Sequence, residues 1–369
     1  MIYRARFLAV TLILSCLTTA SCGGRAAPIA DTVLLGIYYG NQGQDMDGVR
    51  DLEGWQGKKS AVVNMFTNWC ESPGAIEELF ERQLLNIWDN GSVPMVTWEP
   101  FLCSPDQTPD DVEVRAAAGE YDVYLGAWAD HLKAFLGGSD GTYGTSDDRR
   151  AYIRLGHEMN GDWYPWGAAV GNNSPSDFVD MWERVRGVFN DRGMDATRVQ
   201  WIWAVNHDDV GPFGAEEYYP GDANIDWVGI DGFNWGATES WSTWKSPSAS
   251  YDGMLGRVRT LTTKPVGLVE FGTTTSTSSG PSVAAKSQWI TELFDYTVAK
   301  KLRMVAWFNE DKETDWAVFG GGDGDTTYTA GNRDYRAYSA YRAGVRGDRF
   351  IGSDSSRARL LTDDQFAGR

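Results

Sequence analysis

This chain of 369 residues is poor in basic side chains, and that scarcity limits what it can bind. It contains 33 lysines and arginines against 51 aspartates and glutamates, which gives a formal net charge of −18. Binding to nucleic acid or to an anionic membrane needs a basic patch, so this balance argues against both. A neutral substrate suits such a surface, although the charge can also serve solubility alone. After its first 22 residues, the sequence has no apolar run long enough to span a bilayer.

The N-terminus has the features of an export signal. Arg4 and Arg6 give it a positive charge, and the apolar run at 7–17 is too short to cross a membrane. Small residues follow, and the run Thr-Ala-Ser-Cys22 resembles the lipobox of a bacterial lipoprotein, in which that cysteine carries the lipid. We therefore predict that residues 1–22 are a signal peptide and that the protein is exported from a bacterium. Lipidation and ordinary secretion both stay open.

Cysteine is scarce as well, because the chain has four and two of them lie in this leader. The other two, Cys70 and Cys103, each follow a predicted strand. If those two strands are neighbours, the loops after them emerge side by side, and a disulfide can form in an oxidising compartment. Two free buried thiols are the alternative.

Eight apolar runs alternate with helix-like stretches along the rest of the chain. They read as continuous apolar segments, as expected for parallel strands buried on both faces. The runs are Val33–Tyr39, Ala61–Phe66, Pro94–Trp98, Ala151–Gly156, Gln200–Val205, Ile225–Ile230, Val266–Glu270 and Arg303–Phe308. Ser-Pro pairs at 72–73 and 174–175 are typical helix starts.

This alternation predicts one (β/α)8 TIM barrel over residues 33–350, after a linker at 23–32. A doubly wound open sheet is the alternative, but no glycine-rich phosphate loop follows the first strand. Residues 351–369 show little periodicity, and we predict that they are a disordered tail.

Two segments rich in Gly, Asp and Thr, at 137–150 and 320–333, are predicted to be solvated loops. Calcium binding through their aspartates is the alternative, but neither has EF-hand spacing. His207 is followed by Asp208 and Asp209, which we interpret as a polar barrel rim in preference to a metal site. We predict no metal and no cofactor.

Two glutamates come directly after apolar strands. Glu158 lies in Tyr152-Ile-Arg-Leu-Gly-His-Glu-Met-Asn-Gly-Asp-Trp-Tyr-Pro-Trp-Gly, and Glu270 lies in Pro265-Val-Gly-Leu-Val-Glu-Phe-Gly. In a barrel, the C-terminal strand ends face the active site, so the two carboxyls can lie about 5–5.5 Å apart, the spacing of retaining glycosidases. Glu270 would be the nucleophile and Glu158 the acid/base, its pKa raised by apolar neighbours such as Trp163. For either glutamate alone, a salt-bridged barrel-end residue is the alternative.

The first of these motifs, Arg154-Leu-Gly-His-Glu-Met-Asn-Gly-Asp-Trp-Tyr-Pro-Trp, resembles the acid/base motif of glycoside hydrolase family 26. Its His-Glu pair is specific, because related retaining barrels usually have Asn-Glu there. Val-Glu270-Phe-Gly resembles the family's nucleophile strand, and the segments 226–235 and 305–308 resemble its strands six and eight. The family contains mainly endo-β-1,4-mannanases, with some mixed-linkage β-glucanases and β-1,3-xylanases.

The resemblance also implies roles for single residues. His157 and Trp163 would contact the sugar in the −1 subsite, Trp307 would form the floor of that subsite, and Asp231 would help to bind the sugar. From the strand pattern, Arg154 has the parity to point inward and orient Glu158.

Two departures from the family pattern lie around the −1 subsite. Mannanases of the family usually have a histidine near the end of strand three, where this chain has Thr97-Trp-Glu-Pro100. Strand six often carries a tyrosine that bonds the nucleophile, and here Phe233 takes its place. Both departures weaken the prediction of mannan specificity more than they weaken the prediction of hydrolysis. Glu99, Trp98, Phe233 and Tyr38 remain candidates for contact with the sugar, and packed rim aromatics are the alternative for the last.

The sequence therefore predicts an exported, monomeric, retaining endo-β-glycanase that hydrolyses a polysaccharide or oligosaccharide. β-1,4-Mannan is the first expectation, and mixed-linkage β-glucan or β-1,3-xylan the second. A catalytically weak, surface glycan-binding lipoprotein is the alternative from another class. Any attachment to a membrane would be through a lipid on Cys22.

Overall fold

We describe a computed structural model of the chain, which covers residues 31–70, 72–103 and 107–369. The predicted signal peptide and the lipidation site at Cys22 lie outside these described residues, and so does most of the linker. In the described part of the chain, no helix combines the length and the apolar character needed to cross a membrane.

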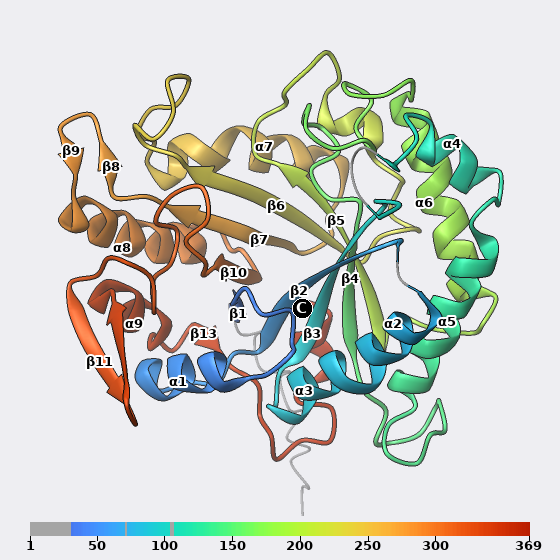
Figure 1. Cartoon of the computed structure of the whole chain (residues 1–369), viewed down its shortest axis with the longest axis horizontal. Coiled ribbons are helices and arrows are strands. Elements are labelled where there is room, and N and C mark those ends of the chain that lie inside the picture. The colour runs from blue at the N-terminus through green and yellow to red at the C-terminus, as the bar shows by residue number, and fades with distance from the viewer. Residues whose placement is uncertain (1–30, 71, 104–106) are drawn as a thin grey trace, which may run out of the picture. The chain divides into compact units, whose positions relative to one another are not determined.

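Eight parallel strands close into a barrel, which confirms the predicted fold (Figure 1). Each strand pairs with its neighbour in chain order, and the last pairs with the first, so that Leu34 lies opposite Met304 and Tyr38 opposite Phe308. The strands are β1 (Val33–Tyr38), β2 (Val62–Asn68), β3 (Val93–Glu99), β4 (Ala151–Leu155), β5 (Val199–Asn206), β6 (Trp227–Asn234), β7 (Val266–Thr273) and β10 (Met304–Phe308).

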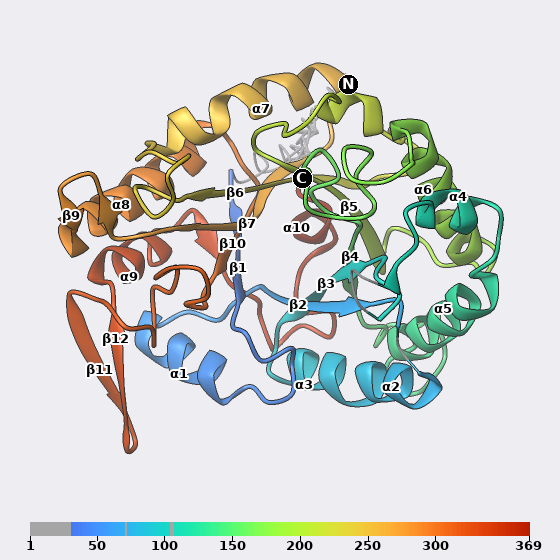
Figure 2. The same cartoon turned by 45° about the horizontal axis from the view of Figure 1, so that its top comes forward.

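Helices surround the barrel as an outer ring (Figure 2). They are α1 (Asp47–Gln56), α2 (Pro73–Glu78), a π-helical turn (Leu79–Gln83), α3 (Leu84–Asp89), α4 (Val112–Ala117), α5 (Asp122–Leu136), α6 (Pro175–Asn190), α7 (Pro247–Leu261), α8 (Val283–Ala299) and α9 (Ser339–Val345). Both predicted Ser-Pro starts are confirmed. The Ser72 hydroxyl accepts a hydrogen bond from the Ala75 N–H at 3.3 Å, and Ser174 forms a capping box with Asp177.

The strands divide their side chains between two apolar clusters. Alternate residues such as Leu34, Met95 and Tyr152 fill the inside of the barrel, whereas their neighbours pack outward against the helices. Gly229 marks how tightly the inside is filled, because a Cβ at this position would lie 2.5 Å from the Val269 side chain. Because apolar side chains fill this inner cluster, polar groups can gather only at the C-terminal ends of the strands.

The segment after residue 351 is folded, contrary to the predicted disordered tail. Strand β13 (Phe350–Ile351) pairs with the start of β1, and a short helix, α10 (Asp363–Phe366), follows. Leu360, Leu361 and Phe366 are buried in the inner cluster. The segment lacks periodicity because it covers the barrel's N-terminal end as an irregular chain, held by burial and hydrogen bonds.

The Gly-rich segment 320–333 also differs from its prediction as a plain loop, because it contains the first strand of a hairpin. Strand β11 (Thr326–Ala330) pairs antiparallel with β12 (Arg333–Ala337), and a second small hairpin joins β8 (Ser276–Thr277) to β9 (Gly280–Pro281). A 3-10 turn at Ala215–Tyr218 completes the described elements.

Candidate active site

Four carboxylates gather at the C-terminal end of the barrel. Glu99 ends β3, Asp231 lies on β6, Glu270 lies on β7, and Glu158 lies in the turn that follows β4. The structure therefore brings the two predicted catalytic glutamates to the same end of the barrel, where the charge of Glu270 helps to raise the pKa of Glu158. Active sites of such barrels lie at this end.

A β-bulge in β7 aims Glu270 into the barrel. Ile230 of β6 pairs with Leu268, but the next residue, Asp231, pairs with Glu270, so Val269 is an extra residue on its strand. Val269 packs in the inner cluster, and Glu270 also faces inward and contacts Arg154. Two consecutive side chains can point to the same face only at such an irregularity, which is common beside active sites.

Arg154 is the fully buried centre of this group. Its guanidinium donates to Asp231 Oδ2 at 2.7 Å, to Glu270 Oε2, and through Nε to Thr97 Oγ1 at 2.8 Å. Burial alone would lower the pKa of Arg154, but the charges of Asp231 and Glu270 raise it. Arg154 does point inward as its strand parity predicts, but its hydrogen bonds go to Glu270 and Asp231 instead of Glu158.

Glu158 is held in an unusual backbone conformation. Its φ is +54°, a left-handed value that is costly for a residue with a side chain, and its N–H donates to the Ala204 carbonyl at 2.9 Å. The Trp163 indole N–H donates to Glu158 Oε2 at 2.9 Å. Burial and the charge of Glu270 raise the pKa of Glu158 to about 8, against the opposing effect of Arg154. This carboxyl therefore keeps its proton at neutral pH.

The other two carboxyls also hold their protons more tightly than usual. Burial and the charge of Glu270 raise the pKa of Glu99 to about 7, while Arg154 and Lys312 oppose the shift. Burial raises the pKa of Asp231, and its Oδ1 has no hydrogen-bond partner in the described part of the chain. With one guanidinium among four carboxyls, the site can hold a proton that is available for transfer.

His157 is buried beneath the turn that carries Glu158. Its ring packs against Phe66, Tyr164 and Trp166 with centroid distances of 5.9, 4.8 and 6.1 Å. Burial, and then the charge of Arg154, lower its pKa well below the usual value, so the ring is neutral. With its side chain enclosed in this way, His157 supports the turn of Glu158 from below.

Aromatic rings line the side of the site next to β1. Tyr38 stacks on Phe308 at 4.7 Å, and Phe308 meets Phe233 edge-on at 5.7 Å. Phe233 also contacts Trp316, at 4.8 Å, in the loop after β10. Phe233 and Tyr38 therefore reach the site region as predicted, and they form one cluster with partners that sequence reasoning missed.

The site residues that sequence reasoning missed differ in whether the sequence could have indicated them. Phe66 and Phe308 have the inward strand parity of Asn64 and Ala306, so a strict alternation could have found them. Trp316 and Lys312 lie in a loop, where no periodicity exists to indicate their direction.

Two predicted sugar contacts are wrong, because both side chains face away from the site. Trp98 is 0% exposed and stacks on Trp128 of α5 at 4.1 Å. Trp307 is 1% exposed and packs against Trp289 of α8, so it cannot form the floor of a sugar subsite. Both residues occupy the outward positions of their strands, between an inward neighbour on each side.

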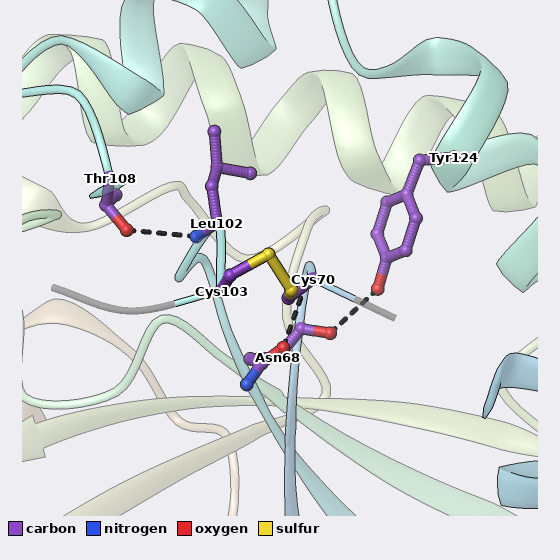
Figure 3. The surroundings of a disulfide bond; sticks show 6 residues. All are labelled: Asn68, Cys70, Leu102, Cys103, Thr108 and Tyr124. Carbon is purple, nitrogen blue, oxygen red and sulfur yellow. Dashed lines mark hydrogen bonds between the residues drawn. A yellow bond between two sulfur atoms is a disulfide. The ribbon is translucent and has the colours of Figure 1, made fainter. Parts of the chain in front are cut away.

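Cys70 and Cys103 are joined by a disulfide, with their Cα atoms 4.3 Å apart (Figure 3). The bond ties the loop after β2 to the loop after β3, as their neighbouring strands allow. Close by, the Tyr124 hydroxyl donates to the Asn68 carbonyl at 2.9 Å, and the Leu102 N–H donates to Thr108 Oγ1 at 2.9 Å. The disulfide thus lies in a well-connected rim at the carboxyl ends of these strands.

The residues that were considered as metal ligands are engaged in hydrogen bonds and ion pairs with other protein groups. His207 Nδ1 lies 2.9 Å from the Ser250 carbonyl, and Asp208 pairs with Lys245 at 2.8 Å. In the loop at 137–150, Asp147 accepts from Ser139, and Asp148 accepts from the Thr145 N–H and pairs with Arg198. Across the described residues, no group of three or more His, Cys, Asp or Glu side chains is placed to hold a metal ion.

Comparisons with known proteins connect this fold and site to one family. The model of glycosyl hydrolase family 26 matches residues 150–253, which include β4, Glu158 and β6. Endoglucanase H of Acetivibrio thermocellus is 29% identical over 318 residues, which is 85% of this chain. The chain spans only 31% of the length of that relative.

Solved structures show the same barrel. A family 26 β-mannanase from Bacteroides ovatus matches with a TM-score of 0.58 at 16% identity, covering 90% of this chain and 94% of its own. The catalytic domain of a family 26 endo-β-1,4-mannanase from Bacillus sp. JAMB-750 matches with a TM-score of 0.60 at 15% identity, covering 92% and 91%. The motif around Glu158 and these matches agree: residues 150–253 resemble glycosyl hydrolase family 26, and the barrel has the fold of solved members of that family.

Proposed function

We propose that this protein is a retaining endo-β-glycanase. The observation that carries the proposal is the contrast between its two central carboxyls. The pKa of Glu158 is raised to about 8, whereas Glu270 forms an ion pair with the buried guanidinium of Arg154. A buried carboxyl with a raised pKa near a carboxyl that contacts a cation is the arrangement expected of an acid and a nucleophile.

In this mechanism, Glu270 attacks the anomeric carbon while Glu158 gives its proton to the departing glycosidic oxygen. The covalent glycosyl-enzyme is then hydrolysed by water, from which Glu158 takes a proton as the base. Arg154 and Asp231 act through Glu270 as positioning residues, because Arg154 bonds both carboxylates. No cofactor is needed for these steps.

For the substrate, we favour a β-1,4-linked polymer of neutral hexoses, with β-glucan first and β-mannan second. The name Endoglucanase H belongs to a relative at 29% identity, whereas the family 26 mannanase structures are 15–16% identical. The two departures near the −1 subsite, Glu99 and Phe233, point in the same direction, because they replace residues usual in mannanases. The expectation of mannan from the sequence therefore moves to second place.

The test is reducing-end release by the purified chain from residue 31 onward. Mixed-linkage β-glucan, glucomannan, galactomannan and β-1,3-xylan are each supplied, with the Glu270→Gln variant as the matched control. We expect release from at least one polymer and a loss of roughly 1000-fold or more in that variant. Release that survives in both Glu270→Gln and Glu158→Gln would refute the mechanism.

A glycan-binding protein without turnover is the second candidate, and Phe233 favours it because phenylalanine cannot donate a hydrogen bond to the nucleophile. Retention on a polymer without reducing-end release would support it. The Phe233→Tyr variant then decides between loss of catalysis through this residue and a wrong choice of polymer.

We also propose that the protein is exported, with Cys22 as the candidate lipidation site. The disulfide between Cys70 and Cys103 supports an oxidising compartment. Mass spectrometry of the protein from a bacterial host measures the N-terminus. A start at Cys22 with a lipid mass supports lipidation, a start nearby without that mass supports secretion, and an intact Met1 contradicts export.

A further inference from the structure

Two tryptophans are largely exposed in the described part of the chain, and only one of them has a role so far. Trp163 is 42% exposed and bonds the Glu158 carboxyl. Trp241, in the loop between β6 and α7, is 69% exposed. An exposed indole offers a broad apolar face and an N–H group to a binding partner.

A chain of ring contacts leads from the catalytic site to Trp241. The Trp241 ring lies 5.4 Å from Trp235, which lies 4.9 Å from Trp316, which in turn lies 4.8 Å from Phe233. Phe233 follows Asp231 on β6 and Trp316 is buried beneath, so Trp235 and Trp241 form the outer, accessible part of this row. An unbroken row of ring contacts therefore joins Trp241 to the active site.

The loop that carries Trp241 is held in place by its backbone. Gly236 has a φ of +53°, and a Cβ there would lie 2.0 Å from the Ser276 carbonyl oxygen, so only glycine fits. The Ala237 N–H donates to that same oxygen at 3.0 Å, and the Lys245 N–H donates to Asn234 Oδ1 at 2.9 Å. Figure 1 shows this loop and the β8–β9 hairpin projecting on the same side of the barrel. Trp241 is thus presented in advance of binding, at a small cost in ordering.

We propose that Trp241 and Trp235 form a distal sugar-binding subsite, which holds a pyranose unit of the β-glycan chain several units from the cleaved bond. This inference rests on the proposed function. The indole faces match the apolar C–H faces of a pyranose ring, and neither indole N–H donates a hydrogen bond among the described residues. Both N–H groups are therefore free to meet sugar hydroxyls. The occupant is a neutral glycan, because the row continues directly into the site that cleaves it.

The test uses oligosaccharides of increasing length from the polymer that the wild-type protein cleaves. For Trp241→Ala, we expect kcat/KM to fall about three- to tenfold on a hexasaccharide, with less than a twofold change on a trisaccharide. Trp241→Phe keeps a ring and should retain most of the activity. Val123→Ala, at an exposed site on α5, is the matched surface control and should match wild type. Equal loss on both lengths, or no loss on either, overturns the proposal.

A binding measurement separates this subsite from the proposed catalysis. Migration of Glu270→Gln in native gels that contain soluble β-glucan or glucomannan reports binding without turnover. We expect retardation that is weakened by adding Trp241→Ala and unchanged by adding Val123→Ala. If wild type cleaves nothing but this pattern holds, then the subsite stands and the glycanase proposal fails. If the polymer is cleaved but the retardation is indifferent to Trp241, then the subsite fails and the glycanase proposal stands.

Discussion

At the scale of single residues, the site depends on how one guanidinium is shared. Arg154 donates hydrogen bonds to Glu270 and Asp231 but not to Glu158, whose pKa is raised by burial and by the charge of Glu270. One strand position thus forms an ion pair with the proposed nucleophile and leaves the proposed acid without a bonded cation. Because these groups are buried, the charge state of each one depends strongly on the charges beside it.

Trp163→Phe tests how the acid is tuned. The indole N–H favours the ionised form of Glu158, so its loss should raise the pKa of that carboxyl further above about 8. Because Glu158 must be protonated for the first step, the alkaline limb of the kcat/KM–pH profile should move to higher pH. The shift should be about 0.4–1 pH unit, the equivalent of one hydrogen bond. A limb that stays in place or moves to lower pH contradicts this role.

The Arg154→Lys variant tests whether the shared hydrogen bonds of the guanidinium position Glu270. A lysine keeps the charge but cannot donate to Asp231, Glu270 and Thr97 in one fixed geometry. We expect kcat to fall roughly 100-fold through misplacement of Glu270, with a smaller effect on KM. Circular dichroism and the melting temperature show whether the variant is folded. Full activity in a folded Arg154→Lys variant would refute the positioning role.

At the scale of elements, the sequence predicted where the strands lie. It predicted which way their side chains point only in part. The eight apolar runs predicted the barrel because buried parallel strands need continuous apolar residues. Trp98 and Glu99 are neighbours on one strand and cannot both face inward, so alternation alone contradicts the predicted role of Trp98. The same alternation would have misplaced Glu270, because the bulge at Val269 leaves no mark in the sequence.

The rim formed by β2 and β3 offers an element-scale prediction. The disulfide closes a segment with a sequence separation of 33, and for a loop of that size the loss of chain entropy is worth about 3–4 kcal/mol. The double variant Cys70→Ser/Cys103→Ser should therefore melt several degrees lower, and reductant should lower the wild-type melting temperature by a similar amount. Calorimetry with and without reductant measures both. Identical melting in all four samples would mean that the bond adds no stability.

At the scale of the whole molecule, the chain after β13 completes the barrel at the end opposite the active site. Arg150 donates to the Leu361 carbonyl at 2.8 Å, and Tyr152 donates to the Phe366 carbonyl at 2.9 Å. These contacts join segments more than 200 residues apart, so no local pattern could have predicted them. Sequence reasoning finds periodic elements, whereas this segment is stabilised by burial and hydrogen bonds with residues far away in the chain.

Removal of residues 352–369 tests how much this segment contributes to the stability of the barrel. Three buried apolar side chains, Leu360, Leu361 and Phe366, would be lost, each worth about 1.5–3 kcal/mol, and the inner cluster would meet water. We expect a large fall in melting temperature or insoluble protein, measured by thermal unfolding of the soluble fraction. The single variant Phe366→Ala should cost about 3–5 kcal/mol and remain folded. A truncated protein that melts with wild type would show that the segment is dispensable.

The most direct test of the central claim is the stereochemistry of the first product. Proton NMR follows the anomeric signals while the purified protein cleaves a soluble β-glycan oligosaccharide, before mutarotation mixes the anomers. A double displacement at Glu270, with Glu158 as the acid/base, predicts that the β-anomer appears first. Initial appearance of the α-anomer would mean a single displacement, and would contradict the assignment of Glu270 as the nucleophile.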